Sequence, residues 1–122
     1  MSCGIRVRLK EIPAVLERDI ARLNILWSDG LRRFGGPYLA GESFTAVDAF
    51  YAPVAFRVQT YGLALDTSAE AYVDHLLGDR AMREWYADAL QETLRDQAHD
   101  DEIAQCGELL EDLRASSTSP AK

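Results

Sequence analysis

Residues 44–61 read FTAVDAFYAPVAFRVQTY and place apolar side chains around the whole circumference of the helix that they predict. Thr45 and Asp48 have the spacing of a capping box, in which each side chain accepts a hydrogen bond from the other residue's backbone N–H. The Asp48 carboxylate also suits the positive end of a helix dipole. Because a helix that is apolar all round needs neighbours on every side, we expect this helix to be the buried centre of the fold.

The flanking sequence predicts further helices around that centre. Before it, Pro13 and six apolar residues at helical spacing predict a long amphipathic helix over about residues 13–34, which Gly35-Gly36-Pro37 ends. After it, apolar spacing predicts a short helix from Thr67 to about residue 77, a fourth over about residues 80–96, and a weaker fifth over about residues 103–113. We find no alternating strand pattern. The expected fold class is an all-α bundle of about five helices around the buried central helix.

Length and composition limit the class of protein. The chain has 122 residues, of which 48% are hydrophobic, so we expect a single domain over residues 1–115. It has no long apolar run for a membrane span and no secretory leader, so we expect a cytoplasmic protein. Cys3 and Cys106 lack metal-ligand spacing, and no metal site is expected. The net charge of −7 argues against nucleic acid as a partner.

The two ends of the chain carry opposite charge. Residues 1–10 hold Arg6, Arg8 and Lys10 and no acid, and we expect a basic arm or the remnant of a truncated first helix. Residues 96–112 hold seven acids and no Lys or Arg. A solvated acidic face is the default interpretation of that segment, and an acidic end lying against a basic surface is the alternative. Residues 116–122 are expected to be a disordered tail.

Residues 35–61 resemble the signature of the glutathione S-transferase (glutathione transferase) C-terminal domain. In that family a Phe/Tyr-Leu-x-Gly loop precedes a buried helix that Ser/Thr-x-x-Asp opens, and Tyr38-Leu39-Ala40-Gly41 and Thr45 to Asp48 match this order. The resemblance extends from about Ile12 to Ala98. It implies an all-helical domain whose full-length relatives conjugate or isomerise electrophiles, with glutathione as cosubstrate.

The resemblance also implies what this chain lacks. Members of the family begin with a thioredoxin-like domain, which binds glutathione and activates its thiol, and we find no such domain in the sequence. We therefore expect no cofactor bound by this chain alone, no catalytic residue and no activity by itself, and whether the chain is an enzyme stays open. The partners that it implies are a second copy in a homodimer or a thioredoxin-like domain.

The family's electrophile pocket is lined by the first helix of this domain and by parts of the central helix. The substrate-binding candidates here are Arg6, Arg8, Arg57 and Tyr61. In zeta-class relatives an arginine late in the central helix binds an anionic substrate, but that position is Thr60 in this chain. Arg57 lies one turn earlier on nearly the same face, and it either substitutes for that arginine or has a structural role.

A second hypothesis comes from a different functional class. The same helices would form a stand-alone interaction or dimerisation module, because apolar surface without a covering domain tends to mark an interface. The sequence alone does not decide between this interaction module and the helical domain of a glutathione transferase-type protein.

Overall fold

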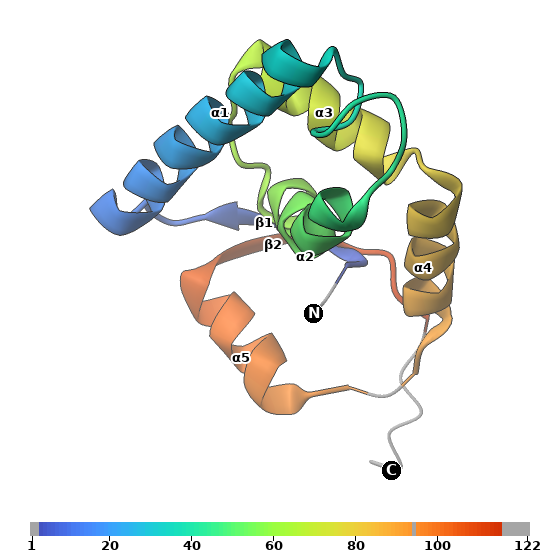
Figure 1. The fold of residues 1–122 in the computed structure, drawn as a ribbon. Coiled ribbons are helices and arrows are strands. Elements are labelled where there is room, and N and C mark those ends of the chain that lie inside the picture. The colour runs from blue at the N-terminus through green and yellow to red at the C-terminus, as the bar shows by residue number, and fades with distance from the viewer. Residues whose placement is uncertain (1–2, 94, 116–122) are drawn as a thin grey trace, which may run out of the picture.

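The computed structural model describes residues 3–93 and 95–115, which form five helices and one two-stranded sheet (Figure 1). The helices are α1 (Ala14–Phe34), α2 (Ala46–Tyr61), α3 (Thr67–Leu77), α4 (Arg80–Gln91) and α5 (Gln97–Cys106). The strands are β1 (Ile5–Leu9) and β2 (Gly107–Asp112). The all-α class with α2 at its centre is confirmed. The expected tail at residues 116–122 lies outside the described residues.

The main core forms where α1, α2 and α3 meet. Trp27 of α1 is fully buried, and its ring makes edge contacts with the rings of Tyr51 on α2 and Tyr72 on α3. Ala55 and Phe56 of α2 are also buried there. The enclosure of α2 is incomplete, because Phe50 is 75% exposed near its N-terminal end. The expectation that neighbours cover every face of this helix is therefore wrong for its first turns.

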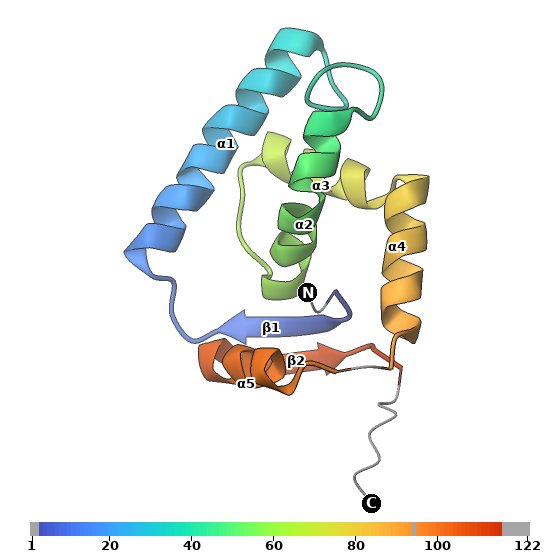
Figure 2. The same ribbon diagram turned by 60° about the horizontal axis from the view of Figure 1, so that its bottom comes forward.

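The first ten residues differ from the expected arm. Ile5 to Leu9 form β1, with Ile5 and Val7 buried against Ile103 and Tyr61 in a second, smaller core. In Figure 2, β1 passes across the C-terminal end of α2. The expectation that the sequence has no alternating strand pattern is wrong here, because apolar and basic residues alternate from Ile5 to Leu9 and give an extended strand one face to bury.

The expected fifth helix is also wrong in its position. Asp96 caps α5 by accepting a hydrogen bond from the His99 N–H at 3.3 Å, so this helix begins well before Ile103. The chain becomes extended at Gly107 and continues as β2, which pairs antiparallel with β1. The fourth helix ends at Gln91 instead of about residue 96, since Glu92 is already extended.

Pairing of the two strands brings the basic start of the chain against its acidic end. Arg8 lies opposite Glu108, and Arg6 lies opposite Glu111. The acidic end therefore lies against a basic strand, as the alternative expected, and it is also a solvated face, because every residue of β2 after Gly107 is exposed. Within the described residues, no helix combines the length and the apolar character needed to span a membrane.

Candidate functional site

The predicted substrate-binding residues lie on two neighbouring elements, β1 and the C-terminal half of α2. Arg57 and Tyr61 lie one turn apart on α2, and Arg6 and Arg8 lie two residues apart on β1. These elements contact each other where the end of α2 meets the strand (Figure 2). The structure thus brings the two pairs to the same region of the molecule, but it gives the four side chains different surroundings.

Arg6 is held by the protein itself. Its Nη1 atom donates to the carbonyl oxygens of Cys3 and Ile5, both at 3.0 Å, and its Nη2 atom donates to the Tyr86 hydroxyl at 2.8 Å. Its guanidinium carbon also lies 5.8 Å from the centre of the Tyr86 ring. Arg6 therefore joins β1 to α4, and a structural role accounts for its contacts.

Arg8 and Arg57 are more accessible to a ligand. Arg8 makes an ion pair with Glu108 at 3.5 Å, but the two side chains remain 70% and 68% exposed. Arg57 is exposed, and within residues 3–93 and 95–115 its side chain makes no hydrogen bond or ion pair. An exposed cation without an internal partner is free to bind an anion.

Tyr61 combines a packed ring with a protonated hydroxyl. Its ring lies half-buried against Ile5, Val7 and Ile103. Burial raises the pKa of Tyr61, the nearby Cys106 raises it further, and Arg57 opposes the shift. The hydroxyl is therefore neutral near pH 7 and is able to donate a hydrogen bond beside Arg57.

Asp48 organises a buried hydrogen-bond cluster at the start of α2. Its Oδ2 atom accepts from the Thr45 N–H at 2.9 Å, as the spacing of the two residues predicts. Its Oδ1 atom accepts from the Tyr72 hydroxyl at 2.7 Å and from the Leu39 N–H at 3.3 Å. Asp48 is fully buried, so these donors replace the water that its charge would otherwise need.

The contacts of Tyr72 and Leu39 were not predictable from the spacing of Thr45 and Asp48. Burial, followed by the hydrogen bond to Asp48, raises the pKa of Tyr72 far above its ordinary value of 10.0. Asp48 thereby connects three segments, namely the loop at Leu39, the start of α2 and the middle of α3. The hydrogen bonds of the Asp48 carboxylate all come from other groups of the protein, which favours a role in folding over a role in chemistry.

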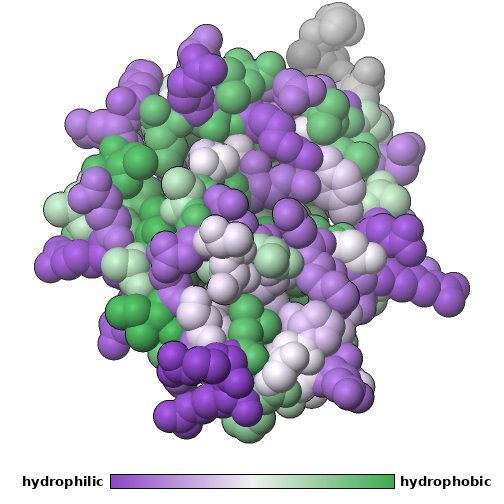
Figure 3. All heavy atoms as spheres, turned by 90° about the horizontal axis from the view of Figure 1, so that it is seen from above, coloured by the Kyte–Doolittle hydropathy of each residue, from purple (hydrophilic) through white to green (hydrophobic). Residues whose placement is uncertain are grey.

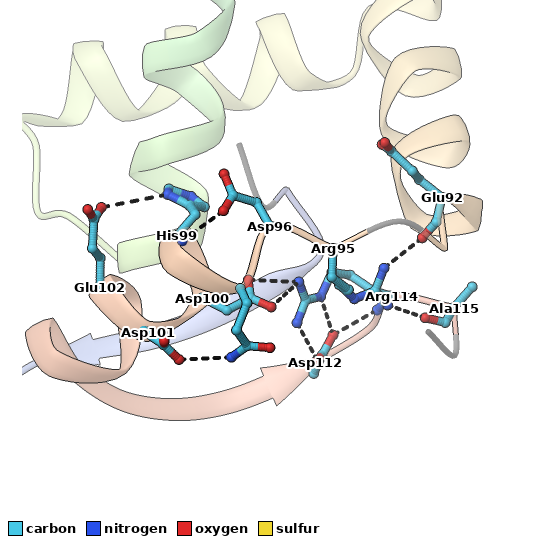
Figure 4. Close-up of polar contacts among 11 residues, drawn as sticks. Glu92, Arg95, Asp96, His99, Asp100, Asp101, Glu102, Asp112, Arg114 and Ala115 are labelled. Carbon is cyan, nitrogen blue, oxygen red and sulfur yellow. Dashed lines mark hydrogen bonds and ion pairs between the residues drawn. The ribbon is translucent and has the colours of Figure 1, made fainter. Parts of the chain in front are cut away.

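A second polar cluster, which the sequence did not indicate, closes the C-terminal end of the described chain (Figure 4). The Arg114 guanidinium donates to both Asp112 oxygens at 2.9 and 2.8 Å, and to Asp100 of α5 at 3.2 Å. Arg114 holds the pKa of Asp112 below its ordinary value. Arg95 adds hydrogen bonds to the carbonyl oxygens of Glu92 and Ala115. These contacts fix the end of β2 against α5.

Two cavities lie near these elements. One of about 90 Å³ lies between β1, α5 and β2, with Ile5, Ile103, Ala104 and Leu109 as its apolar lining and Asp100 and Arg114 at its polar side. Another of about 200 Å³ lies between α2 and α3 and includes Glu70 and Asp74. Within the described part of the chain, no group of three or more His, Cys, Asp or Glu residues is placed to hold a metal ion.

Comparison with known families agrees with the architecture around α2. The model of the glutathione S-transferase C-terminal domain matches residues 8–88, which is about two thirds of the chain. The chain belongs to this family. The part that matches the glutathione S-transferase C-terminal domain runs from β1 into α4 and includes the Asp48 cluster, Arg57 and Tyr61, whereas α5 and β2 follow it. No curated protein and no solved structure matches the chain.

Proposed function

We propose that this chain forms the electrophile-binding, helical half of a glutathione S-transferase-type protein. The observation that carries the proposal is the family match over residues 8–88 together with the exposed Arg57 and the half-buried Tyr61 at the C-terminal end of the central helix. Glutathione activation would require a thioredoxin-like domain, which the described residues do not contain. The 122-residue chain is therefore inactive alone in this proposal, and Thr45 and Asp48 serve folding.

The region around Arg57 is the binding site that we propose for an anionic electrophile. Arg57 supplies a cation whose side chain has no partner among the described residues, Tyr61 supplies a neutral hydroxyl one turn away, and Arg8 adds a second exposed cation on β1. Arg6, in contrast, is engaged with Tyr86.

Two measurements on the purified chain test this function. With glutathione and chlorodinitrobenzene we expect no conjugation above the rate in buffer, and a clear acceleration would refute the claim that the thiol chemistry resides elsewhere.

Titration with anilinonaphthalene sulfonate, an apolar anion, tests the binding region. Arg57→Gln should weaken binding by about two- to fivefold, because an exposed ion pair contributes up to about 1 kcal/mol.

The matched control for that titration is Arg83→Gln. Arg83 is an exposed arginine of α4 that also makes no ion pair within residues 3–93 and 95–115, so its loss removes the same charge from a different place. Equal weakening by both variants would show that only net charge matters, and the assignment to Arg57 would be wrong.

A stand-alone interaction or dimerisation module is the second candidate. The observation in its favour is the exposure of large apolar side chains on α1, including Ile25 and Leu26, and of Phe50 on α2. Figure 3 shows hydrophobic and hydrophilic residues intermingled on the face seen from above, so that face has no single extended apolar surface. Either function fits the cytoplasm, where the thiols of Cys3 and Cys106 would stay reduced.

A further inference from the structure

The outer edge of β2 is a strand edge without a partner. The sheet has two strands in the order β1-β2, so one side of β2 pairs with no other strand in the described chain (Figure 2). Every residue of β2 after Gly107 is exposed, including Leu109 and Leu110. Unpaired backbone N–H and C=O groups along an exposed edge are a template for an added strand.

The charges on β2 limit which strand the edge accepts. Glu108 and Glu111 would point to opposite faces of a regular strand, because they are three residues apart. The register shift between Arg6 and Val7 leaves Leu110 as an extra residue on β2, and this bulge returns Glu111 to the face of Glu108. Both glutamates therefore share one face, on which Arg6 and Arg8 lie opposite them across the ladder.

The described part of the chain offers the Glu111 carboxylate no partner that neutralises its charge. Its register partner Arg6 donates instead to Tyr86, and Arg114 engages Asp112 and Asp100. Among residues 3–93 and 95–115, the Glu111 side chain makes no hydrogen bond or ion pair. The edge thus carries an accessible anionic side chain next to unpaired backbone groups, and beside it lies the cavity of about 90 Å³ that Leu109 helps to line.

We propose that the outer edge of β2 binds an extended, positively charged peptide segment of a partner protein as a third strand of the sheet. Backbone hydrogen bonds would hold the segment, its Lys or Arg side chains would lie next to Glu108 and Glu111, and an apolar side chain would enter the cavity beside Leu109. A second copy adding β2 to β2 would place these glutamates against each other, which disfavours self-pairing.

The chain supplies the probe for the test. Residues 4–10, GIRVRLK, include the strand with which β2 already pairs. A synthetic peptide of this sequence with blocked termini is therefore titrated into the full chain while amide hydrogen exchange is followed. We expect β2 amides that exchange freely to gain protection while β1 amides keep theirs. A peptide with both arginines replaced by glutamate should bind at least about threefold more weakly at low salt.

Glu111→Lys tests the side chain that carries the proposal, and Glu42→Lys, an exposed acid in the loop before α2, is the matched control. Glu111→Lys should weaken peptide binding by about threefold or more and Glu42→Lys should leave it unchanged, with unaltered circular dichroism in both. The proposal is wrong if the peptide does not bind, if it binds equally after charge reversal, or if β1 loses protection because the peptide replaces it. Concentration-dependent protection of the β2 edge without peptide would assign the edge to a second copy and overturn the proposal too.

Discussion

Asp48 shows how one side chain links local and tertiary structure. Its carboxylate accepts from the Thr45 and Leu39 N–H groups and from the Tyr72 hydroxyl, and it is fully buried. Asp48→Ala should lower the free energy of unfolding by about 2–4 kcal/mol, since each buried donor left unsatisfied costs roughly 1–3 kcal/mol. Asp48→Asn should recover only part, because its NH₂ group would face a donor. Urea unfolding measures both changes, and equal midpoints for the parent and Asp48→Ala would rule out this role.

Tyr72 predicts a pH dependence with a definite sign. Burial and the hydrogen bond to Asp48 raise its pKa above the ordinary 10.0, so an unfolded Tyr72 ionises while the folded one keeps its proton. The stability that this contributes is present below about pH 10 and is lost as the pH rises further. Tyr72→Phe should be less stable by about 1.5–3 kcal/mol near neutral pH, through loss of a hydrogen bond to a charged group.

The difference between parent and Tyr72→Phe should then shrink by about 1.4 kcal/mol at about pH 11. Urea midpoints across this pH range provide the measurement, and the other tyrosines act as an internal reference because both proteins contain them. A difference that stays constant with pH would contradict the assigned protonation state of Tyr72.

At the scale of elements, the sheet depends on the absence of a side chain at Gly107. A Cβ atom there would overlap the Arg8 carbonyl oxygen and lie 2.9 Å from Val7 Cγ1. Gly107→Ala should destabilise the protein by about 1–3 kcal/mol through overpacking and should speed hydrogen exchange of β1. The control is Gly78→Ala, whose Cβ atom would lie 3.3 Å from the Asp74 carbonyl oxygen and should cost less. Unchanged β1 protection in Gly107→Ala would show that the strands do not pair as described.

The elements differ in how far the sequence predicts them. The start of α2 and the end of α1 follow from local signals, namely the spacing of Thr45 and Asp48 and the left-handed Gly35, whose N–H donates to the Leu31 carbonyl oxygen. The sheet was missed because β1 alternates over only five residues and its partner strand GELLED, about 100 residues away, does not alternate. Pairing at that separation leaves no local signal, although the opposite charges of the two ends hinted at it.

At the scale of the whole molecule, one part of the candidate site could be predicted from the sequence and another part could not. The resemblance directed attention to Arg57 and Tyr61, which do lie together at the end of α2, but residue spacing could not show that Tyr86 engages Arg6. Nor could it show the Arg114 cluster, since Asp100 and Arg114 meet only when β2 folds back along α5. Contacts within one helix were predictable, whereas contacts that depend on strand pairing were not.

Self-association of the whole molecule tests whether the exposed apolar residues of α1 form an interface. If α1 supplies a dimer interface, sedimentation of the parent at high micromolar concentration should show a dimer, and Ile25→Glu should shift it toward monomer because a charge would be buried in the contact. Ile25 is 70% exposed, so the variant should keep the stability of the parent. Ala87→Glu on α4 is the control, as it adds the same charge at another exposed helical position. A parent that stays monomeric, or a dimer indifferent to Ile25→Glu, would contradict the assignment of an interface to α1.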